Sequence, residues 1–213
     1  MKSYDVLLNP EANLIKLEVT PLGDRFARAL SLAVGWHGAQ TRKGVTIPYM
    51  SHLMTVSSIV MEHGGNEDQA IAALFHDSLE DAPDAVEAAK REALMREEFG
   101  DAVTEIVLGC TDGKPNGSGV KPPWKERKTG YLKAMRTKPD STLLVAGSDK
   151  LHNLTCTVRD LRRDGIETLS RFGASVDEQA WYYAEIGMIL AERNIPMAKE
   201  YGVLMAEFQG ALS

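Results

Sequence analysis

Two apolar segments of this chain carry ionisable side chains in places where burial is expected. The first, at residues 72–81, reads AALFHDSLED, and the second, at residues 141–158, has Asp149 near its middle. The apolar spacing of the second segment predicts a buried helix that carries Asp149 inward. Burying a carboxylate is costly unless it is paired or binds a metal ion. A fold that accepts this sequence therefore needs a partner or a metal ion beside Asp149.

We expect the first segment to continue a helix that begins after Asn66, a favourable N-cap residue followed by two acidic residues. On such a helix Glu80 lies one turn beyond His76. Asp81 likewise lies one turn beyond Asp77. The His-Asp pair can then bind a cation, and the Glu-Asp pair can reach a water molecule bound to that cation.

An ordinary structural interpretation competes with this one. A histidine among apolar residues is usually a satisfied core residue, and acidic residues at a helix end usually belong to the solvated surface. Glu80 and Asp81, however, come at the C-terminal end of the expected helix, where carboxylates oppose the helix dipole and do not stabilise it. The further presence of His52 and Asp149 favours a metal site over the ordinary interpretation.

The order and spacing of four motifs resemble the hydrolase domains of the RelA/SpoT-homologue family. HGAQTRKG at residues 37–44 and PYMSH at 48–52 are similar to the family's HxGQxRK and PYxxH, HDSLED at 76–81 matches HDxxED, and DKLHN at 149–153 resembles the end of LAD(R/K)xxN. The similarity extends over residues 24–195 and leaves no room for a synthetase domain. We therefore expect a stand-alone small alarmone hydrolase, similar to the metazoan SpoT homologue. The implied fold is all-α, a compact HD-domain helical bundle.

The resemblance also implies roles for individual residues around a divalent cation, usually manganese in this family. The implied metal ligands are His52, His76, Asp77 and Asp149. Glu80 and Asp81 would position and deprotonate the attacking water. His37 matches a family position that is not a ligand, and we expect it to orient the turn at residues 42–43.

The implied substrate contacts are Arg42, Lys43, Lys150 and Asn153. From the sequence alone, Asn153 shares a helix face with Asp149, and its amide offers both a donor and an acceptor for the edge of a nucleobase. A local structural hydrogen bond is the competing interpretation. The family usually has an arginine shortly after this asparagine, and this chain does not, so one phosphate or ribose contact is either missing or supplied by Arg159.

The donor set itself is suited to catalysis. Two imidazoles and two carboxylates leave coordination positions open for water and substrate, and suit Mn, Fe, Co or Zn. The ligating carboxylates cancel the charge of the cation, and Glu80 and Asp81 add negative charge, so a polyphosphate needs basic residues elsewhere. Arg42 and Lys43 are candidates. The basic segment at 114–128, rich in glycine and proline, is either a loop that closes over phosphates or a solvated linker.

Composition limits the remaining possibilities. A net charge of -6 over 213 residues argues against a nucleic-acid partner. We expect one packed domain at residues 21–213 and an N-terminal arm at 1–20 that is either a short strand or an extended segment. No signal peptide or transmembrane segment is recognisable, and Cys110 and Cys156 have no paired spacing, so we expect a cytoplasmic protein without a membrane partner. Self-association is left open.

Helical patterns and cap residues cover most of the rest of the chain. Helices are expected from Asp24, around 53–60 before Gly64, at 84–100, at 124–135, at 142–162, at 177–193 and from Pro196 onward.

The function we expect is metal-dependent hydrolysis of the 3′-pyrophosphate of guanosine tetra- or pentaphosphate, with a small nucleotide as the substrate. One alternative keeps the site and changes the substrate to an adenosine alarmone or to a nucleotide 2′- or 3′-phosphate such as that of NADPH. Another alternative is a sensor that binds an alarmone without hydrolysing it. The acidic pair Glu80 and Asp81 counts against the sensor, because two anions facing phosphate would not help a protein that only binds.

Overall fold

The computed structural model describes residues 21–111 and 123–212, and these residues are almost entirely helical. The helices are α1 (Asp24–His37), α2 (Met50–Glu62), α3 (Glu67–Phe75), α4 (Ala85–Phe99), α5 (Asp101–Cys110), α6 (Trp124–Met135), α7 (Asp140–Asp164), the 3-10 helix η2 (Ile166–Phe172), α8 (Val176–Glu192) and α9 (Ala198–Leu212). Within the described ranges, extended pairing is limited to an isolated antiparallel bridge between Thr41 and Pro48. The expected all-α fold is confirmed.

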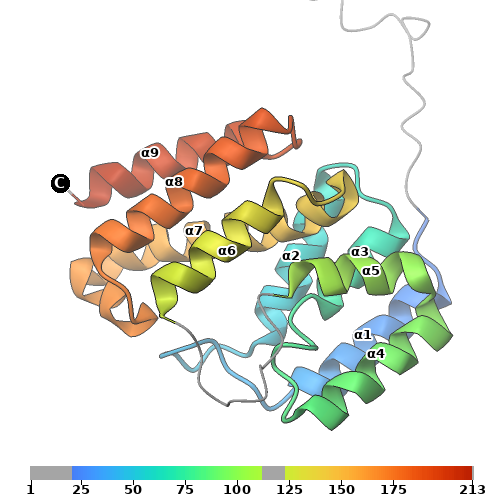
Figure 1. Cartoon of the computed structure of the whole chain (residues 1–213). Helices are drawn as coiled ribbons and strands as arrows, with labels where there is room; N and C mark the ends of the chain where they lie inside the picture. Colours follow the sequence, from blue (N-terminus) through green and yellow to red (C-terminus); the bar gives the residue numbers. More distant parts are fainter. Residues whose placement is uncertain (1–20, 112–122, 213) are drawn as a thin grey trace, which may run out of the picture.

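Two helices form the centre of the molecule. Helix α3 packs against α1, α2, α5 and α7. Helix α7 packs against α2, α3, α5, η2, α8 and α9. Every residue of α3 from Ala70 to Phe75 is buried, which is the pattern of a helix surrounded by others on all sides. Figure 1 shows α1–α5 grouped on one side of the molecule and α6, α8 and α9 on the other. The site described below lies between these groups.

The long helix α7 confirms the buried helix predicted for residues 141–158. It is 25 residues long, and all residues from Thr142 to Asp149 are buried. Ser148 satisfies its hydroxyl within the helix by donating to the carbonyl of Leu144 at 2.8 Å. Asp149 is therefore the first charged side chain after a long apolar stretch, and it lies in the interior.

The expectation that the helix of the first segment continues to Asp81 is wrong. Helix α3 ends at Phe75, and residues 76–81 form turns. His76 Nδ1 lies 2.7 Å from the carbonyl oxygen of Ala73, which is the acceptor that the Asp77 amide would use in a continued helix. Arg91 of α4 donates to the carbonyl of Ser78 at 2.9 Å and holds the turn in place.

The other boundaries agree with the sequence to within a few residues. The expected helix at 84–100 is α4, whose N-cap Asp84 accepts from the amide of Glu87. Helix α5 was not predicted as a separate element. Asp24 is the first residue of α1 and Gly23 is its N-cap, and α9 begins at Ala198, two residues after Pro196. The expected arm at 1–20 and most of the 114–128 segment lie outside the described residues.

Among the described residues, none of the helices combines the length and the apolar character that crossing a bilayer requires.

The contact between α5 and α7 leads to a stability prediction. A Cβ atom at Gly109 would lie 2.6 Å from Cγ2 of Thr142, a buried residue of α7. We expect Gly109→Ala to lower the free energy of unfolding by about 1–3 kcal/mol, the usual cost of overpacking. Gly130→Ala on α6 is the matched control, because a Cβ atom there would meet no other part of the described structure within 4 Å. Urea unfolding of both variants tests this, and equal stability of the two would contradict it.

Candidate metal centre

Four predicted ligands converge from three elements. His52 comes from α2, His76 and Asp77 from the turn after α3, and Asp149 from α7. His52 Nε2 lies 3.2 Å from Asp149 Oδ1. His76 Nε2 lies 3.0 Å from Asp77 Oδ2 and 3.7 Å from Asp149 Oδ1. The ligand atoms of His52, His76 and Asp149 lie within 4.8 Å of one another, so one ion can contact all three.

The chemistry of His76 fits a metal ligand. Its Nδ1 faces the Ala73 carbonyl, so the proton resides on Nδ1 and the lone pair of Nε2 points into the site. His76 Nε2 is buried and makes no hydrogen bond within the described part of the chain. A buried nitrogen that is aimed at two carboxylates and lacks a hydrogen bond is the arrangement that a cation completes.

The carboxylates keep the site negatively charged. Burial alone would raise the pKa of Asp149, but the charge of Lys150, the hydrogen bond with His52 and the charge of His76 hold that pKa well below its usual range. Burial also opposes a charged His76, yet Asp77 and Asp149 raise the pKa of its imidazole well above the usual value. The site therefore attracts positive charge, whether a proton or a metal ion. Metal binding would displace that proton.

Two predicted substrate residues are bonded to the predicted ligand Asp149. Lys150 Nζ contacts Asp149 Oδ2 at 2.5 Å, and Asn153 donates from Nδ2 to Asp149 Oδ1 at 2.5 Å. Asn153 Oδ1 in turn accepts from Arg42 Nη2 at 2.7 Å. Since both ends of the Asn153 amide are engaged in the protein, the local hydrogen bond considered from the sequence is present.

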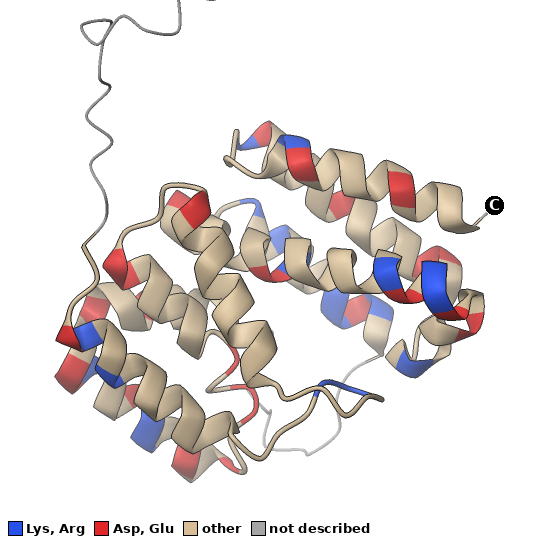
Figure 2. Cartoon of the chain, turned by 180° about the vertical axis from the view of Figure 1, so that it is seen from behind, with Lys and Arg blue, Asp and Glu red and all other residues tan. Residues whose placement is uncertain are grey.

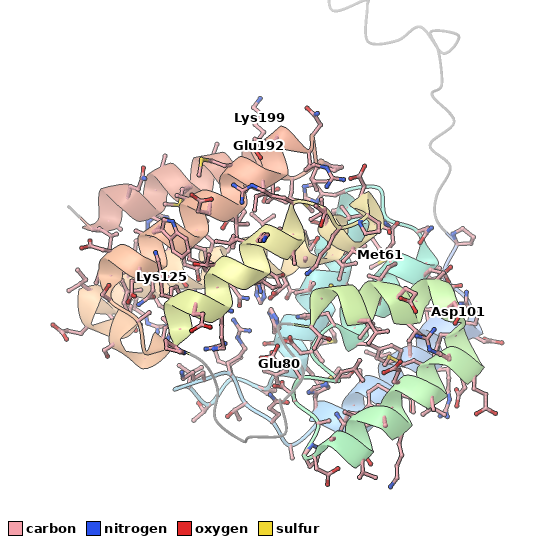
Figure 3. All side chains as sticks on the ribbon, in the orientation of Figure 1. Met61, Glu80, Asp101, Lys125, Glu192 and Lys199 are labelled. Carbon is pink, nitrogen blue, oxygen red and sulfur yellow. The ribbon has the colours of Figure 1, made fainter. Side chains whose placement is uncertain are left out.

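A cavity lies beside these side chains, and the predicted acidic pair, Glu80 and Asp81, is part of its wall. Asp81 Oδ2 accepts from Gln40 Nε2 at 2.7 Å, and Gln40 Oε1 lies 2.7 Å from His37 Nδ1. The structure thus places His37 against Gln40, which orients Asp81, rather than against the turn at 42–43. Partial burial raises the pKa of Asp81, although the Gln40 hydrogen bond opposes the shift. Glu80, labelled in Figure 3, lies between the two groups of helices and lines the cavity.

Tyr49 is a site residue that the sequence reasoning missed. Its hydroxyl donates to Asp77 Oδ2, and its ring lies 5.6 Å from that of His37. Burial and the charge of Asp77 raise the pKa of Tyr49, so the phenol stays a donor. Gln40 was also missed. Both residues fall inside the motifs at 37–44 and 48–52, so those motifs were the available signal.

The cavity beside the ligands has a volume of about 610 Å³, a size suited to a nucleotide. One part of its wall carries predicted metal ligands and the acidic pair. The basic residues in its wall are Arg42, Lys43, Lys128, Lys150, Arg159 and Arg171. Figure 2 shows basic residues in the α1–α2 connection and acidic residues in the connection after α3. Arg159, one of the two alternatives considered for the missing family arginine, lines the cavity.

Comparisons with known proteins agree with this picture. Residues 29–174 match the HD domain family. A protein named GTP pyrophosphokinase from Streptomyces coelicolor is 31% identical over 175 residues, which cover 79% of this chain and 19% of that protein. A guanosine-3′,5′-bis(diphosphate) 3′-pyrophosphohydrolase from Haemophilus influenzae is 31% identical over 123 residues, which cover 55% of this chain and 16% of that protein. The chain thus spans a fifth or less of the length of these curated relatives.

A solved structure shares the fold. It is that of a metazoan orthologue of SpoT, described as hydrolysing ppGpp, and it matches with a TM-score of 0.65 at 23% identity, covering 91% of this chain and 99% of that chain. With the family match, this confirms the resemblance drawn from the motifs.

The ligand geometry predicts the effect of removing one donor. We expect the wild-type protein to retain about one equivalent of divalent metal and His76→Ala to lose it, because the variant lacks a nitrogen donor at the point where both carboxylates meet. The metal content after dialysis, measured by plasma mass spectrometry, checks this. His63→Ala is the matched control, because His63 contacts Ile59 and Glu200 away from the cavity. Retention of metal by His76→Ala at the wild-type level would contradict the assignment.

Proposed function

The chain belongs to the HD domain family, and we propose that it is a metal-dependent hydrolase that removes the 3′-diphosphate from guanosine tetra- or pentaphosphate. One observation carries the proposal above others. The donors of His52, His76 and Asp149 converge inside a cavity of about 610 Å³, with Asp81 in its wall. This combination supplies a cation site, a proton acceptor and space for a nucleotide.

We take Mn²⁺ as the native metal and His52, His76, Asp77 and Asp149 as its ligands. When bound, a divalent cation lowers the pKa of a coordinated water molecule and so supplies a nucleophile at neutral pH. The residues of the chain account for the remaining chemistry, which consists of moving a proton, holding the phosphates and orienting the ligands.

Asp81 is our general base, with Glu80 holding the attacking water. The raised pKa of Asp81 makes its carboxylate a stronger base. The contacts from His37 to Gln40 and from Gln40 to Asp81 fix the position of that carboxylate. Water attacks the phosphorus next to the ribose 3′ oxygen, and the bond between that phosphorus and that oxygen breaks. The products are GDP and pyrophosphate when the substrate is guanosine tetraphosphate.

Basic residues in the cavity wall offset the negative charge of the centre. Arg42 and Lys43, on the connection between α1 and α2, and Lys128 on α6 approach the cavity from opposite groups of helices. Guanidinium and ammonium groups are suited to hold phosphate oxygens. Lys150 already contacts Asp149, so we assign it a double role, neutralising the ligand and meeting the nearest phosphate.

The curated relatives include proteins named for synthesis and for hydrolysis. The acidic pair and the metal donors supply hydrolytic chemistry, so we favour hydrolysis. A nucleotide with another base or phosphate arrangement, such as an adenosine alarmone or NADPH, is the second candidate. The observation that favours it is that the Asn153 amide is already bonded to Asp149 and Arg42, which leaves one N–H and one oxygen lone pair of that amide to select guanine.

We further propose that residues 21–213 act as one HD-type unit in the cytoplasm. Cys110 and Cys156 are both free thiols, as expected in a reducing compartment.

A nucleotide panel tests the substrate. With Mn²⁺, guanosine tetraphosphate should give GDP and one pyrophosphate, and a chelator should stop the reaction until Mn²⁺ is restored. Ion-exchange chromatography separates pyrophosphate from phosphate. Release of phosphate from NADPH without turnover of the guanosine substrate would favour the second candidate. Binding of guanosine tetraphosphate with no turnover of any nucleotide in the presence of Mn²⁺ would favour the sensor.

A substitution tests the proton acceptor. We expect Asp81→Asn to keep its metal and to lose about 10² in kcat, the usual contribution of a general base. The exposed Asp177→Asn on α8 is the control and should retain wild-type kcat. Steady-state kinetics together with metal content give the result. Loss of metal from Asp81→Asn would make this carboxylate a ligand instead.

A further inference from the structure

A third histidine lies beside the centre, on α7, and neither the motif comparison nor the proposed mechanism gives it a role. His152 is partly buried, lines the cavity and comes three residues after Asp149. Its Nδ1 lies 2.6 Å from Nδ1 of the ligand His52. Its Nε2 lies 3.3 Å from Sγ of Cys156, one helical turn further on.

The two rings meet edge to edge. Their centroids are 4.9 Å apart and their planes differ by 20°. The centroid separation equals the 2.6 Å distance between the two nitrogens plus the radius of each ring. The two ring centres and the two Nδ1 atoms therefore lie along one line. Nearly coplanar rings joined through their Nδ1 atoms have the geometry of an N–H···N hydrogen bond, which needs one proton and one lone pair between the nitrogens.

Only one distribution of protons agrees with metal binding. A His52 that offers its Nε2 lone pair to a cation must carry its proton on Nδ1 and donate it. His152 must then accept at Nδ1 and, as a neutral ring, carry its own proton on Nε2. That proton faces Cys156 Sγ, which can accept it.

The two imidazole ligands are therefore held in different ways. His76 is fixed by a backbone carbonyl, that of Ala73, and His52 is fixed by a side chain. We propose that His152 is a positioning residue for the metal centre: it accepts the Nδ1 proton of His52, turns the Nε2 lone pair toward Asp77 and Asp149, and is held in place by Cys156. The inference rests on the proposed metal centre and adds to it a determinant of metal affinity.

A pair of variants with similar shape tests the role. Asparagine places Oδ1 close to where Nδ1 of histidine lies, so His152→Asn keeps an acceptor for His52, and His152→Leu removes it. Loss of an outer partner of a ligating histidine typically costs 10–100-fold in metal affinity. We expect the dissociation constant for Mn²⁺ to rise by about that factor in His152→Leu and by a few-fold at most in His152→Asn. Chelator competition measures both constants.

A spectroscopic measurement on the wild-type protein keeps the test valid if the leucine variant does not fold. In the Zn²⁺-loaded, ¹⁵N-labelled protein, long-range ¹H–¹⁵N spectra should show His52 protonated at Nδ1 and His152 protonated at Nε2. A neutral His152 protonated at Nδ1, or a doubly protonated His152, would overturn the proposal. Wild-type metal affinity in a folded His152→Leu would overturn it as well.

The outcomes also separate this inference from the proposed function. A wild-type protein that binds no divalent metal would remove the metal centre and the role of His152 together. If the wild-type protein binds metal and hydrolyses nucleotide, and His152→Leu has the same metal affinity, the proposed role of His152 is wrong and the proposed function stands.

Discussion

The buried carboxylate of Asp149 is the interaction on which the rest of the structure depends. It follows a long buried stretch of α7, where an unpaired charge would be strongly destabilising. Contacts from Lys150 and Asn153 on the same helix and from His52 on α2 stabilise the Asp149 carboxylate. Because the contact from His52 crosses between helices, it joins α2 to α7 beside the cavity.

The helix that ends early at Phe75 is the second constraint. If α3 had continued as a regular helix, its carbonyl groups would have been used by its own amides. His76 takes the Ala73 carbonyl instead, and the chain turns, so that His76 Nε2 and Asp77 both face Asp149. The same turn leaves Asp81 within reach of Gln40. A local departure from helix geometry therefore builds both the proposed ligand set and the position of the proposed base.

The sequence predicted what depends on local pattern and missed what depends on tertiary contact. The buried helix around Asp149 followed from apolar spacing, and the helix at 84–100 followed from its cap residues. The break at Phe75 could not be predicted, because it depends on one side-chain hydrogen bond and on Arg91, which arrives from another helix. The partners Tyr49 and Gln40 lay in recognised motifs, but their contacts with Asp77 and Asp81 join residues 28 and 41 positions apart.

Under the proposed function, the charge of the centre assigns substrate binding and hydrolysis to different parts of the cavity. In the proposed metal centre, Asp77 and Asp149 neutralise the divalent cation, so the acidic pair leaves this region with surplus negative charge that repels a polyphosphate. Attraction has to come from the basic wall, which includes Arg42 and Lys43 on one side and Lys128 on the other. In such an arrangement, substrate affinity and the chemical step are set by different residues. Changes in the basic wall can therefore alter which nucleotide binds and leave the metal, its ligands and Asp81 as they are.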